Sequence, residues 1–297
     1  MVLITGATSQ LGEVLVKKLV ERNENVRCFV RADSKIEKLK YENVDFAYGD
    51  FNDIPSINKA VKDIDYLIHI GGIWHAEKFL MELDQENVNL KKAIFVGSTS
   101  RFQKVNSKDP KEINLVTGMT NAEELINNSK QKTIIIRPTM LYGLDKDKNI
   151  YTLIKFMNKY RVFPIIGEGT GLKQPVHVYD VADAVLTSMY KEDLCKNEYN
   201  IPGASPVEYN EMIQQIKRNL GKSVFVFHIP ITLARIGFYL FKKLRPNTFL
   251  NIEMINRVNK SYTFEYTNAQ KDFNYQPMSF QDGVKTQIEY LKKVGKI

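Results

Sequence analysis

The chain has 297 residues, of which 43% are hydrophobic, so it can bury the core of one α/β domain with a lobe or of two small domains. Its formal net charge of +8 favours anionic partners: phosphorylated cofactors, nucleotide-linked substrates or anionic membrane surfaces. No aromatic-studded basic strand and no helix-turn-helix pattern occurs, so we expect no nucleic acid as a partner.

Cysteine usage and hydropathy indicate the compartment. Cys28 and Cys195 lie far apart and resemble neither a disulfide framework nor a metal-ligand cluster, so we expect a reducing, cytoplasmic compartment and no metal. The first strand begins at residue 2, which predicts that no signal peptide is present. No apolar run reaches the roughly 18 residues that a transmembrane helix needs.

The first predicted element is a hydrophobic strand over 2–4, which runs into a glycine-containing turn and an amphipathic helix over 11–22. The backbone N–H groups of this turn can point at a pyrophosphate near the positive end of the helix. A second strand over 26–30 completes the context, so the turn predicts dinucleotide binding; a βα turn without a ligand is the alternative. The predicted cofactor contacts are Gly6, Thr8, Ser9, Gln10, Leu11 and Gly12.

The end of the second strand indicates which dinucleotide binds. Arg31 follows this strand, and its guanidinium suits the 2′-phosphate of NADP, whereas the nearby Asp33 keeps NAD open as the alternative. After a third strand over 44–48, Asp50 can accept a hydrogen bond from the adenine amino group or can simply cap the turn. Asp50 and its neighbour Phe51 complete this part of the predicted cofactor site.

The remaining elements alternate between strands and helices, as in a parallel sheet covered on both faces. We therefore predict a Rossmann-type, doubly wound α/β fold with a smaller mixed C-terminal substrate lobe. The cofactor domain is predicted to comprise 1–145 plus about 172–192, and the lobe about 146–171 plus 193–297. The other predicted strands are 66–70, 93–96, 133–136 and 176–178, and the other predicted helices are 55–62, 74–86, 110–128, 149–160 and 181–190, with a Gly-rich, hairpin-like stretch at 167–171.

Several further motifs point to a family. They are Gly49-Asp50, Gly71-Gly72, Arg137-Pro138 to Tyr142-Gly143, and the segment from Gln174 to Ala182. With the first turn, they resemble an extended short-chain dehydrogenase/reductase of the NAD(P)-dependent sugar epimerase/dehydratase class. The resemblance implies cofactor contacts from Gly71, Gly72 and Pro138 and substrate contacts from Tyr142 and His177, with packing as the alternative for His177. It also implies a homodimer through the helices that flank the fifth strand.

The chain departs from this family in one respect. Members usually carry a Tyr and a Lys four residues apart on the helix after the fifth strand, where the Tyr acts as acid and base. Here Leu115 and Met119 stand at those positions, and neither can transfer a proton. The Tyr-x-x-x-Lys spacings that begin at Tyr151 and Tyr239 fall outside that helix, so we assign both to structure.

Polar residues near the expected nicotinamide are the remaining candidates for chemistry. The resemblance places Thr99 at the family's hydroxyl position, where it can hydrogen-bond a substrate oxygen. We predict Lys104 and His75 as further catalytic groups, and Ser100 and Arg101 as substrate contacts. The alternatives are a Ser/Thr run that caps backbone groups, a solvated loop and the start of a helix.

The segment 225–246 is apolar on most faces and ends in a basic cluster. It can lie in a membrane interface with Lys242, Lys243 and Arg245 at anionic headgroups. The alternative, which we favour at this point, is a core helix of the lobe whose dipole is complemented by the basic residues.

Two classes of function follow from these features. The first is an NAD(P)(H)-dependent oxidoreductase or epimerase of a nucleotide- or lipid-linked sugar in surface polysaccharide metabolism, in the cytoplasm or on the inner face of the membrane. The second is a regulatory or assembly protein that binds NADP(H) and has lost the chemistry. The absent Tyr and Lys favour the second, and the substrate lobe favours the first.

Overall fold

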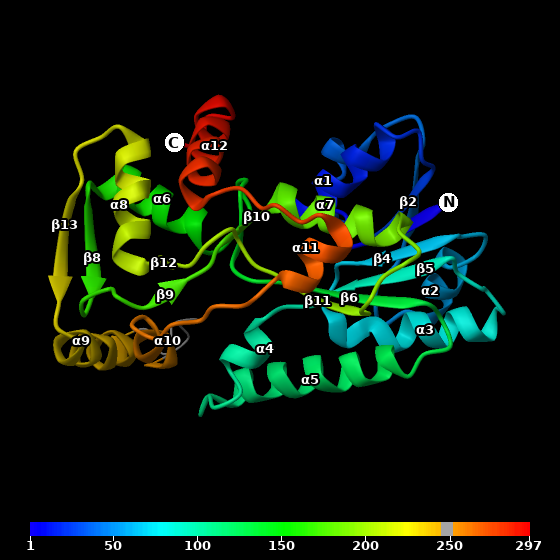
Figure 1. Ribbon diagram of the computed structural model, residues 1–297, viewed down its shortest axis with the longest axis horizontal. Coiled ribbons are helices and arrows are strands. Elements are labelled where there is room, and N and C mark those ends of the chain that lie inside the picture. The colour runs from blue at the N-terminus through cyan, green and yellow to red at the C-terminus, as the bar shows by residue number, and fades with distance from the viewer. Residues whose placement is uncertain (245–251) are drawn as a thin grey trace.

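Seven parallel strands form the central sheet in the order β11-β6-β5-β4-β1-β2-β3 (Figure 1). The computed structural model describes residues 1–244 and 252–297. The chain order reverses at β1, which pairs with β2 on one side and β4 on the other, and this confirms the predicted doubly wound fold. The strands are β1 (Val2–Thr5), β2 (Val26–Val30), β3 (Val44–Tyr48), β4 (Tyr66–His69), β5 (Lys92–Val96), β6 (Thr133–Pro138) and β11 (Glu198–Ile201).

Helices cover both faces of the sheet because its strands are apolar on both sides. One face packs against α1 (Gln10–Val20), α7 (Val178–Tyr190) and α11 (Thr267–Phe273), and the other against α2 (Ile54–Ala60), α3 (Ala76–Gln85) and α5 (Pro110–Asn127) (Figure 1). Side chains alternate between the two cores, so that Ile4 enters the first and Leu3 the second. Three short helices, η1 (Glu37–Leu39), η2 (Ile73–His75) and α4 (Ser100–Gln103), lie in connections.

The lobe has a third hydrophobic core, which gathers side chains of three amphipathic helices and two-stranded ladders. These helices are α6 (Ile150–Tyr160), α8 (Tyr209–Leu220) and α12 (Phe280–Lys293). The ladders pair β7 (Leu141–Tyr142) with β10 (Val176–His177), β8 (Val162–Ile166) with β13 (Phe225–Ile229), and β9 (Leu172–Lys173) with β12 (Val207–Glu208). At its edge lie α9 (Ile231–Leu244) and α10 (Ile252–Arg257).

The predicted division of the chain differs from this arrangement in two segments. β11 and α11 were placed in the lobe by the sequence, yet β11 is the edge strand beside β6, and α11 packs on α7 and β11. Only two side chains of β11, Tyr199 and Ile201, are buried, so the strand carries a weak pattern. The stretch 167–171 forms no hairpin, because β8 before it pairs in parallel with the distant β13.

A buried ion pair joins the sheet to α5. The guanidinium of Arg137 on β6 donates to both carboxylate oxygens of Glu123 on α5, at 2.9 and 2.7 Å, and to Glu198 of β11 at 2.5 Å. The side chains of Arg137 and Glu123 are 5% and 1% exposed. The pair therefore fixes the end of β6 that leads into the candidate site.

We predict that Glu123→Ala lowers the free energy of unfolding by about 3–5 kcal/mol, because Arg137 loses its main buried partner. Urea denaturation followed by circular dichroism measures this change. Glu21→Ala, which breaks an exposed pair with Lys17 on α1, is the control and should cost about 0.5 kcal/mol or less. Equal losses of unfolding free energy in the two variants would show that the buried pair stabilises the fold no more than an exposed pair does.

Candidate functional site

The turn after β1 is shaped for close approach of a ligand to the backbone. Gly6 has φ +69°, in the left-handed region, and a Cβ on Gly12 would lie 2.5 Å from the carbonyl oxygens of Gly6 and Ala7. Both positions therefore require glycine. Ser9 caps α1, and its Oγ accepts a hydrogen bond from Gly12 N at 3.1 Å. The N-terminus of α1 consequently faces the carboxyl edge of the sheet beside this turn.

A small pocket of about 220 Å³ adjoins the turn and unites the predicted cofactor residues Gly6, Thr8, Arg31, Asp50 and Phe51. The Arg31 side chain is 71% exposed, and its Nε lies 3.6 Å from Asp33, so it is available to an anion. Gln10 is buried, and its Oε1 has no hydrogen-bond partner among the described residues. The glycine cradle and the exposed guanidinium of Arg31 fit the phosphate groups of a dinucleotide.

A buried histidine that the sequence did not single out fixes the next turn. His69 at the end of β4 lies 2.9 Å from Thr5 Oγ1 through Nδ1 and 3.2 Å from the Gly72 carbonyl through Nε2. Burial lowers the pKa of His69 to about 4, so it is neutral at physiological pH. A Cβ on Gly71 would lie 2.5 Å from the Phe51 ring. The Gly71-Gly72 turn is thus held against the cofactor pocket by packing and by His69.

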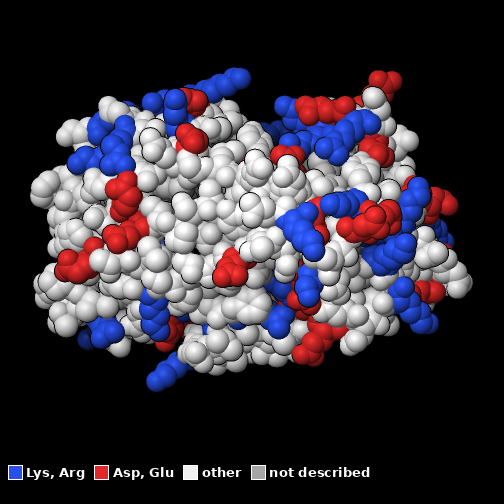
Figure 2. All heavy atoms as spheres, viewed as in Figure 1, with Lys and Arg blue, Asp and Glu red and all other residues white. Residues whose placement is uncertain are grey.

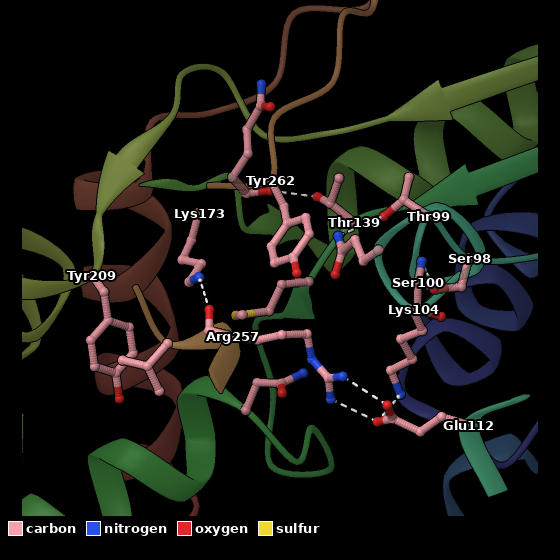
Figure 3. A pocket seen from close by; sticks show the side chains of 15 residues that line it. Ser98, Thr99, Ser100, Lys104, Glu112, Thr139, Lys173, Tyr209, Arg257 and Tyr262 are labelled. Carbon is pink, nitrogen blue, oxygen red and sulfur yellow. Dashed lines mark hydrogen bonds and ion pairs between the residues drawn. The ribbon is translucent and has the colours of Figure 1, made fainter. Parts of the chain in front are cut away.

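A larger pocket of about 570 Å³ lies between the sheet and the lobe (Figure 3). From the sheet side it receives the segment that follows β5, including the predicted residues Thr99, Ser100 and Lys104. The other lining residues are Ser98, Gln103, Glu112, Thr139, Met140, Asn149, Lys173, Gln174, Tyr209, Arg257, Val258 and Tyr262. Figure 3 shows the ring of Tyr262 projecting into this space between Lys173 on one side and Thr139 on the other.

Thr99 occupies the inner wall of the large pocket. It is 1% exposed, its backbone N–H donates to the Pro138 carbonyl at 3.1 Å, and its Oγ1 lies 3.4 Å from the same oxygen. Gln103 Nε2 donates to Thr99 Oγ1 at 3.4 Å. Pro138 therefore supports the hydroxyl through its backbone, and both contacts to the hydroxyl are long enough for a substrate oxygen to compete with them.

Glu112 organises the charges of this pocket. Arg257 donates to both of its carboxylate oxygens at 2.7 Å, and Lys104 Nζ lies 3.3 Å away (Figure 3). Ser107 Oγ also donates to this carboxylate, at 2.6 Å. Burial raises the pKa of Glu112, but the hydrogen bonds from Arg257 and Ser107 and the charge of Lys104 outweigh it and bring the pKa to about 2. The carboxylate therefore stays ionised and holds α5 against the C-terminal end of α10.

Lys173 is a further cation of this pocket, and like Arg257 it comes from the lobe. Its Nζ donates to the carbonyl oxygens of Arg257 and Lys260 at 3.1 and 2.7 Å and lies 5.4 Å from the Tyr262 ring centroid. Burial, with a contribution from the Arg257 charge, lowers the pKa of Lys173 to about 8. Because three cations line the pocket against one carboxylate, that of Glu112, the site favours an anionic ligand.

Two predicted groups lie outside this pocket on the sheet side. His75 stacks on Phe51, with ring centroids 4.7 Å apart, and accepts a hydrogen bond from Trp74 Nε1 at 3.1 Å. It thus adjoins the cofactor pocket and is not brought together with Thr99. Arg101 forms an ion pair with Glu123, and its guanidinium carbon lies 5.1 Å from the Phe102 ring centroid. The structure therefore directs Arg101 to the buried ion pair and away from a substrate.

Tyr142 and His177 are not brought to the pocket either. Tyr142 is 0% and His177 1% exposed, and their rings meet edge to face, with centroids 5.2 Å apart. His177 Nδ1 caps α7 by accepting from Tyr179 N at 3.3 Å, and a Cβ on Gly143 would touch its ring. This geometry gives both residues a packing role and does not support their predicted substrate contact.

The helix α5 contains no tyrosine. Met119 is buried on it, with Sδ 4.0 Å from Ser100 Oγ, and Leu115 packs against the second core. An apolar side chain therefore adjoins the segment after β5 at the position where the resemblance implies lysine. The titratable side chains that α5 is seen to bring to this segment are two carboxylates, Glu123 paired with Arg101 and Glu112 paired with Lys104.

The groups that sequence reasoning missed come mostly from distant segments. Glu112 was seen only as part of a helix, and Lys173, Tyr209, Arg257 and Tyr262 carried no motif. The N-cap at Asp109 placed Glu112 in the first turn of α5, which is the one signal that could have suggested it.

Comparison with protein families settles the class of the chain. Residues 6–191 match the family model described as NAD(P)H-binding. The chain belongs to this family. The match runs from the glycine turn to the end of α7, so it contains both the cofactor pocket and the residues after β5.

Two relatives align over limited lengths. The chain is 43% identical over 67 residues to sterol demethylase protein B of Methylococcus capsulatus, covering 23% of this chain and 20% of that protein. It is 22% identical over 166 residues to the N-acetyl-α-D-glucosaminyl-diphospho-ditrans,octacis-undecaprenol 4-epimerase of Escherichia coli O157:H7, covering 54% and 50%. The alignments thus span a fifth and a half of these relatives.

The fold is shared over its whole length with a solved epimerase. A UDP-glucose 4-epimerase from Thermotoga maritima, determined with UDP-glucose, superposes with a TM-score of 0.76 at 18% identity, covering 99% of each chain. The predicted Rossmann-type fold is therefore confirmed, and the match over residues 6–191 assigns the chain to the NAD(P)H-binding family. The preference for NADP and the homodimer stay predictions.

We predict that Glu112 makes the free energy of unfolding depend on pH. Its pKa is lower in the folded chain, so its stabilisation is present above pH 4.5 and is lost as the pH falls toward 2. The difference in free energy of unfolding between the unmodified chain and Glu112→Gln should therefore shrink over this range, as urea titrations at each pH would measure. In an Arg257→Gln background this pH dependence of the free energy of unfolding should be weaker. A pH dependence of unchanged size would contradict its attribution to the pair of Glu112 and Arg257.

Proposed function

We propose that the chain is an NAD(P)(H)-dependent oxidoreductase or epimerase that acts on a sugar carried by a nucleotide or a lipid, with NADP as its dinucleotide. The observation that carries this proposal is the position of Thr99. Its hydroxyl lines a cationic pocket at the carboxyl edge of the same sheet that presents the glycine turn. In folds of this kind ligands bind at this edge.

The cofactor, when bound, supplies the site with a hydride acceptor or donor. Reduction of a sugar ketone also adds a proton to oxygen, and the chain must hold that oxygen and supply the proton. Thr99 Oγ1 would orient the oxygen by a hydrogen bond. Lys104 is the predicted proton group that the pocket contains. Its pairing with Glu112 at 3.3 Å holds it as an ammonium near Thr99 on the same wall, from which it can donate that proton.

The cationic lining supports an anionic carrier on the sugar. Arg257 and Lys104 share one carboxylate, so their combined charge is only partly neutralised, and Lys173 adds a further cation. A diphosphate group would complement this excess. The names of the relatives agree with either carrier, since one structure holds UDP-glucose and one relative acts on an undecaprenol diphosphate sugar. A role in surface polysaccharide metabolism is part of this proposal.

A second candidate function is a cofactor-binding regulator without turnover. The feature that favours it is the pair of apolar side chains, Leu115 and Met119, at the positions on α5 where the resemblance implies Tyr and Lys. The pocket residues argue against it, because a pure sensor has no use for three cations around a hydroxyl.

Label transfer separates these candidates. The purified chain is incubated with NADPH tritiated at the transferable hydrogen, together with nucleotide-sugar and lipid-linked-sugar extracts. Movement of the label to a sugar supports the oxidoreductase, and the labelled product identifies the substrate. Label that neither moves nor exchanges between epimers, although the dinucleotide binds, would support the regulator.

We predict that Thr99→Val abolishes label transfer, with at least a roughly hundredfold loss, while it leaves dinucleotide affinity within about threefold. Valine keeps the shape of the side chain and removes the hydroxyl. Thr133→Val, at the opposite end of the neighbouring strand β6, is the matched control and should retain transfer. Turnover unchanged by Thr99→Val would remove this hydroxyl from the mechanism.

We predict that Arg31→Ala weakens NADPH binding at least about tenfold more than NADH binding, because only NADPH carries the 2′-phosphate that the guanidinium would bind. Fluorescence titration of both dinucleotides measures the ratio. Lys40→Ala removes one exposed positive charge away from the pocket and controls for the general field. An equal loss for the two dinucleotides would contradict the assignment to NADP.

A further inference from the structure

An unusual apolar stripe faces outward along α9. Four residues spaced i, i+3, i+7 and i+11 share one side of this helix: Leu233, Ile236, Leu240 and Leu244. They are 58, 57, 62 and 80% exposed. Such spacing normally marks the buried face of a helix. Here it marks a face that nothing among the described residues covers.

The opposite side of α9 holds the helix on the protein. Phe238 is buried, and Ile231 and Ala234 are half-buried at the matching i, i+3 and i+7 spacing. Arg235 also donates to Asn256 Oδ1 of α10 at 2.8 Å. The helix therefore has two apolar faces, of which only the narrower is used in the fold. The core-helix interpretation favoured by the sequence is not what the structure shows.

The charges of α9 say which partner fits the outward face. The helix has no acidic residue and carries Arg235, Lys242 and Lys243, the last two in its final turn. Figure 2 shows white and blue atoms along the lower left edge, where Figure 1 places α9. Leucine-rich surface beside lysines is the chemistry of a helix that lies in an anionic lipid interface. Arg245 and Pro246, the end of the predicted membrane segment, lie outside the described residues.

We propose that α9 docks the protein on an anionic membrane surface, with Leu233, Ile236, Leu240 and Leu244 in the interface and Lys242 and Lys243 at lipid headgroups. The helix has 14 residues, about 21 Å at 1.5 Å per residue, so it lies along the surface. No helix among the described residues is long and apolar enough to cross a bilayer.

The side of α9 opposite the docked face adjoins the large pocket through α10. Asn256 receives the hydrogen bond from Arg235, and the next residue, Arg257, reaches Glu112 inside the pocket. Docking through α9 would therefore hold the pocket close to the membrane, with α9 between the pocket wall and the lipid. This inference about the substrate rests on the proposed function: if the chain acts on a sugar, we infer that the sugar is carried by a lipid. Undecaprenol in the name of one relative and sterol in that of another agree with this step.

Vesicle sedimentation of the full chain tests the docking without cofactor or substrate. We expect binding to phosphatidylcholine vesicles that contain phosphatidylglycerol, and weaker binding at high salt. Ile236→Glu with Leu240→Glu should reduce binding at least about tenfold. Lys242→Gln with Lys243→Gln should reduce it about tenfold on anionic vesicles only. All four side chains are exposed, so circular dichroism should show unchanged folding.

Matched controls keep the test specific. Met81→Glu changes a hydrophobic residue that is 52% exposed on α3, and Lys292→Gln with Lys293→Gln changes the corresponding pair in the last turn of α12. Both should bind vesicles like the unmodified chain. Equal losses in the controls, or no binding by the unmodified chain, would overturn the proposal.

A second copy of the chain is the competing occupant of this face. A concentration-dependent dimer in sedimentation velocity that Leu240→Glu abolishes, without vesicle binding, would overturn the membrane proposal. Vesicle binding together with hydride transfer only to water-soluble nucleotide sugars would overturn the lipid carrier and leave the docking intact. Failure of hydride transfer alone bears on the proposed function, because vesicle binding is measured without it.

Discussion

The position of β1 at the point where the strand order reverses is the constraint on which the candidate site depends. The chain leaves β1 toward β2 on one side and returns to β4 on the other, so the connections diverge above the carboxyl end of β1. The glycine turn fills that gap, and the hydrogen bond between Thr5 and His69 ties the ends of β1 and β4 at 2.9 Å. Because all seven strands are parallel, the segment after β5 ends at the same edge. The glycine turn and the large pocket thus lie along the same edge of the sheet.

Glu112 joins the sheet domain to the lobe, because it lies on α5 and binds Arg257 of α10. Removing water from two cations and a carboxylate costs free energy, which the two short hydrogen bonds from Arg257 offset. The arrangement holds Arg257 beside Lys104 although their charges repel. A pocket lined in this way keeps an excess of positive charge that an anionic ligand can neutralise. The Glu112 carboxylate that holds these cations together therefore also limits how strongly they attract that ligand.

The parts of the site that sequence could predict are those encoded within one βα unit. Gly6, Gly12 and Arg31 lie within 30 residues of each other, and their spacing alone implies their geometry. His69 and Arg257 act through contacts to residues that are 64 and 145 positions away, and no local pattern encodes such pairs. His75 and Tyr142 show the opposite problem. Each is close to the site in the sequence, yet its side chain packs against other residues and does not enter the large pocket. The strand β11 was missed for a similar reason, because its pairing with β6 is long-range.

The periodic apolar residues of α9 are compatible with a buried face or with an exposed docking face, and the structure distinguishes the two. Periodic leucines predict burial, and for a helix inside a lobe the interior is the usual place for them. Once Phe238 is seen to supply the packing, the leucines on the far side have no role in the fold of the described residues. Leaving four large apolar side chains in water is unfavourable by several kcal/mol in total. A sequence without function at this face would have little reason to keep them there, and the adjacent lysines indicate an anionic interface as the place where that free energy is recovered.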